Sequence, residues 1–404
     1  MDYILELDSL LHDSSSDDEL EIISTFAMVK ELLDSEGGSR SRRDSGRRRN
    51  TIWHNSLQGK ENLFCHYFAE SPVFPPKKFR RRFRMRRDLF MRIHDTIISH
   101  DRYFVQRRNA AKKLRHSSLQ KMITAIRMLT YGVTSNFMDE YLWIGETTAI
   151  DSFVRFVKVV VSIFSAKYFR SPNPKDIARL LAIGENRGFP GMLGSIDCMH
   201  WKWKNCPNAW RGIYSGHIHE PAIILEAMAS HDLWMWHAFF GLPEFHNDIN
   251  VLERSNVFAN LAEGHAPSVN YSVNGHDYTM GYYLADAQES ARKDVEQAFG
   301  VLQARFAIVH GPARLYQPEL LKDIMMACII LHNMTVEDER GLYLGADEFD
   351  NEQITDIPFE PPSHEHTDEI VDFMQNRHCI RDQETHSQLQ SDLIEHLWQI
   401  HSQS

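Results

Sequence analysis

Apolar residues recur at helical spacing through the first half of the chain. Over residues 77–93 they predict one helix that is packed on one side and carries arginines on the other. The packed positions are Phe79, Phe83, Leu89, Phe90 and Ile93. Downstream, Ser118 is predicted to cap a helix that stops at Gly132, residues 136–142 form a second, and Thr147 caps a third. Two short helices and a longer one are typical of a helix-turn-helix module or of a plain three-helix bundle.

From residue 192 the pattern changes to short apolar runs, which predict strands. The runs lie at 192–197, 222–230, 233–241, 268–275 and 281–286. Helices are predicted around them at 176–184, 249–258, 288–309 and 318–332. This succession predicts an α+β or α/β fold.

Composition narrows the class of protein. The 404 residues are 43 % hydrophobic, which argues against a disordered or fibrous chain. No run approaches the roughly 20 apolar residues of a membrane span, and the acidic start is unlike a targeting peptide. Five scattered cysteines indicate no disulfide framework. We therefore expect an intracellular protein with no membrane partner. The motifs of kinases, dehydrogenases and serine hydrolases are absent from the sequence.

The charge is unevenly distributed. The net charge is −10 over residues 1–36 and −14 over 337–404, which leaves +13 for the centre of a chain whose total is −11. A basic body predicts a polyanionic partner, and DNA is the one we expect. Contacts to DNA phosphates are predicted for Lys77, Lys78, Arg80, Arg81, Arg82, Arg84, Arg86 and Arg87. The alternative is a solvated charged face.

The two ends of the chain carry further signals. A Gly/Ser-rich segment has the composition of a nuclear import signal, although it could be a plain solvated linker. Its arginines are Arg40, Arg42, Arg43, Arg47, Arg48 and Arg49. We expect residues 1–36 to be disordered apart from a short helix over 22–33, and 341–383 to be mostly disordered. The last segment, 383–400, places four apolar residues on one helical stripe, either to dock a partner or to fold back on the core.

Acidic residues follow several of the predicted strands. Asp197 and Asp286 each close an apolar run, Asp248 follows the third run, and Glu296 lies on the long helix beside Val295. Each could be a helix or turn cap. Brought to one sheet edge, the four carboxylates could instead hold two Mg²⁺ or Mn²⁺ ions, which assist phosphodiester cleavage.

Several segments occur in an order that resembles one known family. They are GMLGSIDCMHWKWKNCPNAWRG, PAIILEAMASHDLWMWHAFFG, HNDINVLERS, GYYLAD and QESARKDVEQAFGVLQARFAIVHGPAR. Together they resemble plant transposases of the PIF/Harbinger superfamily. The resemblance implies an RNase H-like nuclease core behind a helix-turn-helix region, and metal-dependent DNA cleavage and joining of the DDE type at terminal inverted repeats. It also implies a Myb-like partner protein, and self-association is a further expectation.

The resemblance maps the acidic metal ligands onto Asp197, Asp248, Asp286 and Glu296, and either Asp248 or Asp286 completes the catalytic triad. One departure bears on activity. Only nine residues separate Asp286 from Glu296, where family members have a few dozen. Glu296 would then lie about 12 Å along its helix, away from the other acids. Two hypotheses follow: an active transposase-type nuclease, or an inactive, domesticated relative that binds DNA or chromatin in the nucleus.

The expected organisation has four parts. Residues 1–76 form an acidic and arginine-rich N-terminal region, and 77–185 form a basic helical DNA-binding region. Residues 186–336 form the RNase H-like nuclease domain, and 337–404 form an acidic tail that ends in the amphipathic helix.

Overall fold

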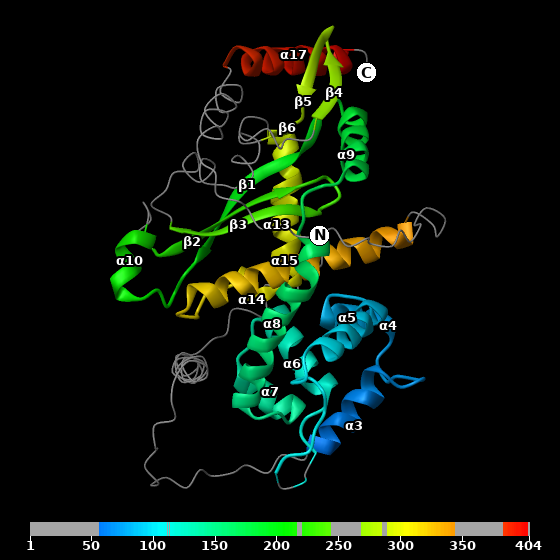
Figure 1. Cartoon of the computed structure of the whole chain (residues 1–404), viewed down its shortest axis with the longest axis vertical. Helices are drawn as coiled ribbons and strands as arrows, with labels where there is room; N and C mark the ends of the chain where they lie inside the picture. Colours follow the sequence, from blue (N-terminus) through cyan, green and yellow to red (C-terminus); the bar gives the residue numbers. More distant parts are fainter. Residues whose placement is uncertain are drawn as a thin grey trace, which may run out of the picture. The chain divides into compact units, whose positions relative to one another are not determined.

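The computed structural model describes residues 56–110, 112, 114–215, 220–243, 268–284, 289–343 and 383–402 (Figure 1). These residues fall into two compact units. Unit 1 takes its residues from Met1–Tyr168, Trp201–Ile223 and Gly300–Thr335. Unit 2 takes them from Phe169–His200, Ile224–Phe299 and Val336–Ser404. The predicted import arginines, the helix at 22–33, the helix at 249–258 and the acidic stretch 344–382 lie outside the described residues.

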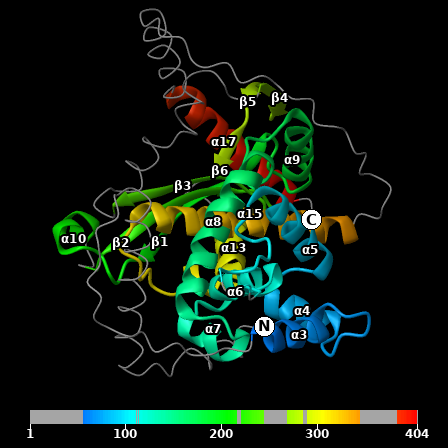
Figure 2. The ribbon, with the colours of Figure 1, turned by 60° about the horizontal axis from the view of Figure 1, so that its bottom comes forward.

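Unit 1 is built mainly of helices, and α3, α4 and α5 pack beside α6 (Figure 2). Its whole helices are α3 (Ser56–Tyr67), α4 (Pro76–Phe83), α5 (Arg87–His100), α6 (Ser118–Tyr131), α7 (Ser135–Leu142), α8 (Glu146–Tyr168), α10 (Asn208–Tyr214) and α14 (Ala307–His310). Two further helices, α13 (Glu289–Arg305) and α15 (Pro318–Tyr343), run from one unit into the other.

The basic segment forms two helices, so the predicted single helix over 77–93 is wrong. The chain leaves α4 at Arg84, whose φ of 57° is left-handed and ends the helix. Met85 is then buried, and α5 begins at Arg87. The predicted packing is confirmed, because the five positions predicted to pack are all buried, namely Phe79, Phe83, Leu89, Phe90 and Ile93.

The predicted three-helix succession is confirmed as α6, α7 and α8. The predicted cap Thr147 is wrong, because α8 begins at Glu146 and Thr147 lies inside it. The cap of α6 is Ser117 rather than the predicted Ser118. Its hydroxyl accepts from the Gln120 amide while the Gln120 side chain accepts from the Ser117 amide, which is a capping box. The helix ends at Gly132 as predicted, since Gly132 has a φ of 62° that a residue with a Cβ adopts at a cost.

Unit 2 contains most of a four-stranded mixed sheet with the order β3-β2-β1-β6. Its strands are β1 (Met192–Lys202), β2 (Ala222–Ala229), β3 (Met235–Pro243) and β6 (Tyr282–Leu284). β6 runs parallel to β1. β1 and β2 are antiparallel, because Gly194 meets the Ala229 carbonyl near one end and the Trp203 amide bonds to the Pro221 carbonyl near the other. The sheet is flanked by helices, so the predicted α+β class is confirmed.

Two further elements of unit 2 refine the predictions. The predicted run at 268–275 is a strand, β4 (Ser268–Val273), and it pairs with β5 (His276–Met280), which was not predicted. The predicted long helix over 288–309 is divided, because α13 ends at Arg305 and Phe306 has extended backbone with a φ of −128°. The predicted helix at 176–184 is α9 (Pro174–Asn186).

The C-terminal helix α17 (Gln383–Ser402) packs against the β4–β5 hairpin, and the two cross each other in Figure 1. Leu393 is buried against Val273 and Tyr278, and Leu389 packs on the same cluster. Leu397 packs against Phe189 and Met192. Of the two alternatives for the apolar stripe, the structure supports the helix that folds back on the core.

Asp392 fastens α17 to the hairpin. Its carboxylate accepts hydrogen bonds from the Tyr278 hydroxyl at 2.6 Å and His276 Nδ1 at 2.9 Å. Its backbone carbonyl accepts from the Asn274 side chain at 2.9 Å. The Tyr278 hydroxyl, followed by Gln388 and His276, outweighs burial and holds the pKa of the Asp392 carboxyl below its usual value. Burial and Asp392 raise the pKa of Tyr278 to about 12.

We expect Asp392→Asn to lower the melting temperature near neutral pH, and its difference from the wild type to shrink in acid. A carboxylate with a lowered pKa stabilises the fold above its unfolded-state pKa of about 3.9, and this stabilisation is lost as the pH falls through the folded-state value. Thermal unfolding followed by circular dichroism at a series of pH values measures this. Glu395→Gln, an exposed carboxylate on the same helix, is the matched control. Equal melting temperatures for the two variants at every pH would contradict the role of Asp392.

No helix in the described ranges combines the length and the apolar character that a membrane crossing requires.

Candidate functional site

Asp197 lies on β1, the inner strand between β2 and β6. It is half-buried, and its Oδ1 accepts a hydrogen bond from the Cys198 amide at 2.8 Å. Ser195 precedes it by two residues, so both side chains leave the same face of the strand. Ser195 is fully buried, and Met199 and Trp201, further along the same face, are buried as well. Asp197 is therefore a half-buried position between buried neighbours on its face of the strand.

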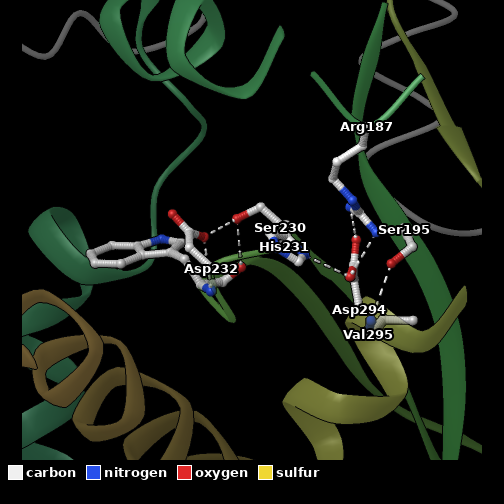
Figure 3. Close-up of polar contacts among 8 residues, drawn as sticks. Arg187, Ser195, Ser230, His231, Asp232, Asp294 and Val295 are labelled. Atoms are coloured by element: carbon white, nitrogen blue, oxygen red, sulfur yellow. Dashed lines mark hydrogen bonds and ion pairs between the residues drawn. The ribbon is translucent and has the colours of Figure 1, made fainter. Parts of the chain in front are cut away.

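Helix α13 docks on β1 at this point. The Val295 amide donates to Ser195 Oγ at 3.1 Å, and Figure 3 shows this bond beside the sheet. Val295 directly precedes Glu296, and Ser195 lies two residues before Asp197. The short link between Asp286 and Glu296 was expected to leave Glu296 about 12 Å along its helix, away from the other acids. The structure brings Val295 of this helix to β1 two residues from Asp197, and the expectation for the Glu296 carboxylate itself stays a prediction.

Glu296 itself is exposed. The buried side of α13 carries Val295, Ala298, Phe299 and Leu302, and Glu296 lies outside that stripe. Both predicted ligands of the described chain, Asp197 and Glu296, are thus reachable from solvent and flank the β1–α13 contact. Asp248 and Asp286 lie outside the described residues.

The buried acid on this part of α13 is Asp294, whose side chain is 4 % exposed. It accepts from Arg187, with Nη1 at 2.5 Å and Nη2 at 3.3 Å. It also contacts His231 Nδ1 at 3.0 Å (Figure 3). Arg187 follows α9 and His231 lies in the turn between β2 and β3, so one carboxylate joins three separate segments of unit 2.

A second polar cluster adjoins the same turn. Ser230 Oγ donates to Asp232 Oδ1 at 2.5 Å and accepts from Trp236 Nε1 at 2.9 Å. Asp232 forms ion pairs with Arg179 and Arg340. Burial alone raises the pKa of the Asp232 carboxyl, but the two guanidinium groups outweigh burial and hold the pKa below its usual value. The turn between β2 and β3 is thus held at two neighbouring residues: His231 contacts Asp294, and Asp232 pairs with Arg179 and Arg340.

The described residues test only part of the predicted metal site. Within them, no cluster of three or more His, Cys, Asp or Glu side chains is placed to bind a metal ion. Asp197 and Glu296 supply carboxylate oxygens, which hard divalent cations prefer. A site with more than these two acidic ligands would draw the others from the segments that carry Asp248 and Asp286.

The predicted DNA-binding residues lie on α4 and at the start of α5. Five of them are exposed, namely Lys77, Lys78, Arg80, Arg81 and Arg87. Arg84 and Arg86 are half-buried. Arg82 is used inside the protein, since its guanidinium stacks 4.0 Å from the Phe74 ring centroid and donates to the Tyr67 hydroxyl.

Sequence reasoning missed Asp294 and its two cationic partners. One signal could have identified Asp294: it precedes Ala298 by four residues, which places it on the apolar stripe of α13. An acid on a buried stripe requires a partner. The partners Arg187 and His231 carry no such local signal, because they are distant in sequence.

Two family models match parts of the chain. Residues 166–287 and 285–343 match a family model described as plant transposon protein. Residues 59–97 match a second model, described as a domain of unknown function, which covers most of α3 to α5. No curated protein and no solved structure matches the chain. The first match covers less than half of the chain and supports a plant transposase-like family and function for the region from α9 to α15.

Proposed function

We propose that this chain is a DNA nuclease of the PIF/Harbinger transposase type, with acidic residues that hold Mg²⁺ or Mn²⁺. The observation that carries the proposal is the contact between the Val295 amide and Ser195 Oγ at 3.1 Å. It brings the segment of Glu296 to the segment of Asp197, although the two are about 100 residues apart in sequence. The match to plant transposon proteins supports the same assignment.

The strand order gives further support. In an RNase H-like sheet, a central first strand carries the first acid and the parallel fourth core strand precedes the second. Here Asp197 lies on inner strand β1, and β6 runs parallel beside it. Asp286 follows β6 by two residues in the sequence. We therefore favour Asp286 as the second ligand and keep Asp248 as the alternative.

The chemistry follows from the residue types. Bound divalent cations would lower the pKa of a coordinated water and stabilise the negative charge that develops on the leaving oxygen. The chain's own contribution is to hold Asp197 on a rigid strand, where the Cys198 amide orients one carboxylate oxygen. The Asp294 contacts to Arg187 and His231 hold α13 in place and so position Glu296.

A DNA-binding surface in unit 1 completes the proposal. Lys77, Lys78, Arg80, Arg81 and Arg87 present exposed cations from α4 and α5. Such cations bind the phosphate backbone without reading its sequence. We assign Arg82 to the protein interior instead, because its guanidinium lies over the Phe74 ring.

Supercoiled-plasmid nicking in the presence of Mn²⁺ tests the nuclease. The wild type is expected to nick the plasmid, and Asp197→Ala is expected to lower the initial rate on the order of 100-fold. Asp277→Ala removes an exposed carboxylate from β5 and is the matched control, with an expected rate equal to that of the wild type. If the wild type and Asp197→Ala both nick the plasmid only at the background rate, the proposal that the chain is a nuclease is wrong. Retained binding of duplex DNA in that case would favour the inactive, domesticated relative.

We further propose nuclear localisation directed by the arginines between Arg40 and Arg49, which lie outside the described residues. The terminal inverted repeats of an element and a Myb-like partner protein are the proposed binding partners. Self-association of the chain is proposed as well. The import proposal rests on the composition of this arginine-rich segment, whereas the inverted repeats and the Myb-like partner rest on the family resemblance. Imaging of a fluorescent fusion with the arginines replaced by glutamine tests nuclear import.

A further inference from the structure

A short hairpin joins α5 to α6 in unit 1. Arg108 and Leu114 form an antiparallel bridge, and the Arg115 amide donates to the Arg107 carbonyl at 2.9 Å. The Gln106 side chain donates to the Arg115 carbonyl at 2.7 Å. We call the described cations of this segment the basic hairpin; they are Arg107, Arg108, Lys112 and Arg115.

Two hydrogen bonds join described residues at the turn of the basic hairpin. Arg108 Nη1 donates to the Lys112 carbonyl at 2.8 Å, and the Lys112 amide donates to the Asn109 carbonyl at 2.9 Å. Lys112 has a left-handed φ of 60°, which turns the chain at this point. Because these bonds hold Arg108, Asn109 and Lys112 in place, binding of a ligand there costs these residues less conformational entropy.

Like charges face each other across the hairpin. The bond between Arg115 and Arg107 makes them a directly opposed pair, so their side chains leave the same face of the ribbon. All four cations are exposed, and none of the ion pairs found between described residues includes Arg107, Arg108 or Arg115. Opposed like charges destabilise a β-ribbon unless an ion of the other sign neutralises them.

Two acids near the hairpin, Asp101 and Asp151, each accept a hydrogen bond from a residue outside it. Asp101 Oδ1 accepts from the Tyr103 amide at 2.8 Å. Asp151 accepts from Arg155 Nε at 2.9 Å. Burial is the largest cause that lowers the pKa of Lys121, and the charges of Arg115 and Arg107 lower it further, whereas those of Asp151 and Asp101 raise it. The two arginines therefore act electrostatically on the adjoining core, and the two acids offset part of that effect.

We propose that the basic hairpin binds the phosphate backbone of duplex DNA, as a contact separate from the exposed cations of α4 and α5. This inference rests on the proposed function for its choice of polyanion. Arginine suits the role because its planar guanidinium forms paired hydrogen bonds to phosphate oxygens. The opposed Arg107 and Arg115 can bracket one phosphate, while Arg108 on the other face reaches a neighbouring one. The contact carries no base specificity.

The test is the salt dependence of DNA binding by the full chain. The triple variant Arg107→Gln/Arg108→Gln/Arg115→Gln is compared with the wild type by fluorescence anisotropy on a labelled DNA duplex over a range of salt. If the three arginines neutralise two or three phosphates, the slope of log K against log salt falls by about 2 to 3. Affinity at low salt is expected to fall at least about tenfold. The matched control replaces three exposed lysines of unit 1, Lys158, Lys167 and Lys322, and is expected to keep the wild-type slope.

A second variant separates this inference from the proposed function. Lys77→Gln/Lys78→Gln/Arg81→Gln removes cations of α4 only. If that variant weakens binding while the hairpin variant keeps the wild-type slope, the inference is overturned and the proposed DNA surface stands. A wild type that binds no duplex DNA would overturn both the inference and the proposed function.

RNA is the other polyanion to be tested. Tighter binding of single-stranded RNA than of duplex DNA, with the same loss of slope in the hairpin variant, would assign the hairpin to RNA and overturn the proposal for DNA. Unchanged circular dichroism of each variant shows that the fold is intact.

Discussion

Replacing Phe83 by alanine is expected to lower the free energy of unfolding of unit 1 by about 3 to 5 kcal/mol. Phe83 has no exposed surface. Its ring centroid lies 4.4 Å from that of Phe79, 5.1 Å from that of Tyr67 and 5.4 Å from that of Phe90. The Arg127 guanidinium lies 5.7 Å from the same ring. Removing the ring leaves a cavity that four packed neighbours cannot close without losing their own contacts.

Urea denaturation followed by circular dichroism measures this loss, and hydrogen exchange of the α4, α5 and α6 amides locates it. Phe137→Ala is the matched control, because this phenylalanine of α7 is 54 % exposed and its replacement is expected to change stability by no more than about 0.5 kcal/mol. Equal effects of the two substitutions would show that the aromatic cluster does not hold these helices together.

The basic segment shows how far helical spacing predicts structure. Five apolar positions between Phe79 and Ile93 were predicted to be packed, and all five are buried. The break at Arg84 was not predicted, because arginine is a good helix former and carries no local stop signal. The break arises from tertiary packing: Met85 enters the core between the two helices, and its neighbour adopts a left-handed φ to allow it.

In the sheet, each strand with a continuous apolar run was predicted from the sequence. β5 was missed because only Tyr278 of its five residues is buried, so it contains no apolar run. The pairing of β6 with β1 could not be predicted either. About 80 residues separate the two strands, and a run of apolar residues does not specify which strand it pairs with. The order that brings Asp197 to an inner strand is therefore information that the structure adds.

For the candidate site, too, the sequence predicted one residue correctly and missed another. Asp197 was predicted from its place at the end of an apolar run, and it lies half-buried on β1. Glu296 was selected because Val295 and Phe299 surround it in sequence, yet the stripe that these residues define places Asp294 on the buried side and Glu296 outside it. Residues four apart share a helix face more closely than adjacent residues do, so Asp294, four before Ala298, was the stronger candidate for burial.

Replacing Asp294 by alanine is expected to destabilise unit 2 by about 2 to 4 kcal/mol. The carboxylate is 4 % exposed, whereas Arg187 and His231 are 25 % and 52 % exposed. Loss of the acid leaves the Arg187 guanidinium and the His231 ring without the carboxylate between them. Because both side chains keep part of their hydration, the loss is expected to be smaller than for a fully buried pair.

Two measurements distinguish a positioning role of Asp294 from general destabilisation. Hydrogen exchange is expected to increase in the first half of α13 for Asp294→Asn, which keeps the shape of the side chain and removes its charge. Asp277→Asn changes an exposed carboxylate on β5 and is expected to leave that exchange unchanged. A double-mutant cycle with Arg187→Ala is expected to give a coupling energy of about 1 to 3 kcal/mol, since the two side chains are in direct contact. Additive effects in that cycle, together with unaltered exchange in α13, would mean that the helix is held on β1 by its apolar stripe alone. In that case the position of α13, and with it that of Glu296, would depend on Val295, Ala298 and Leu302 rather than on the buried charge.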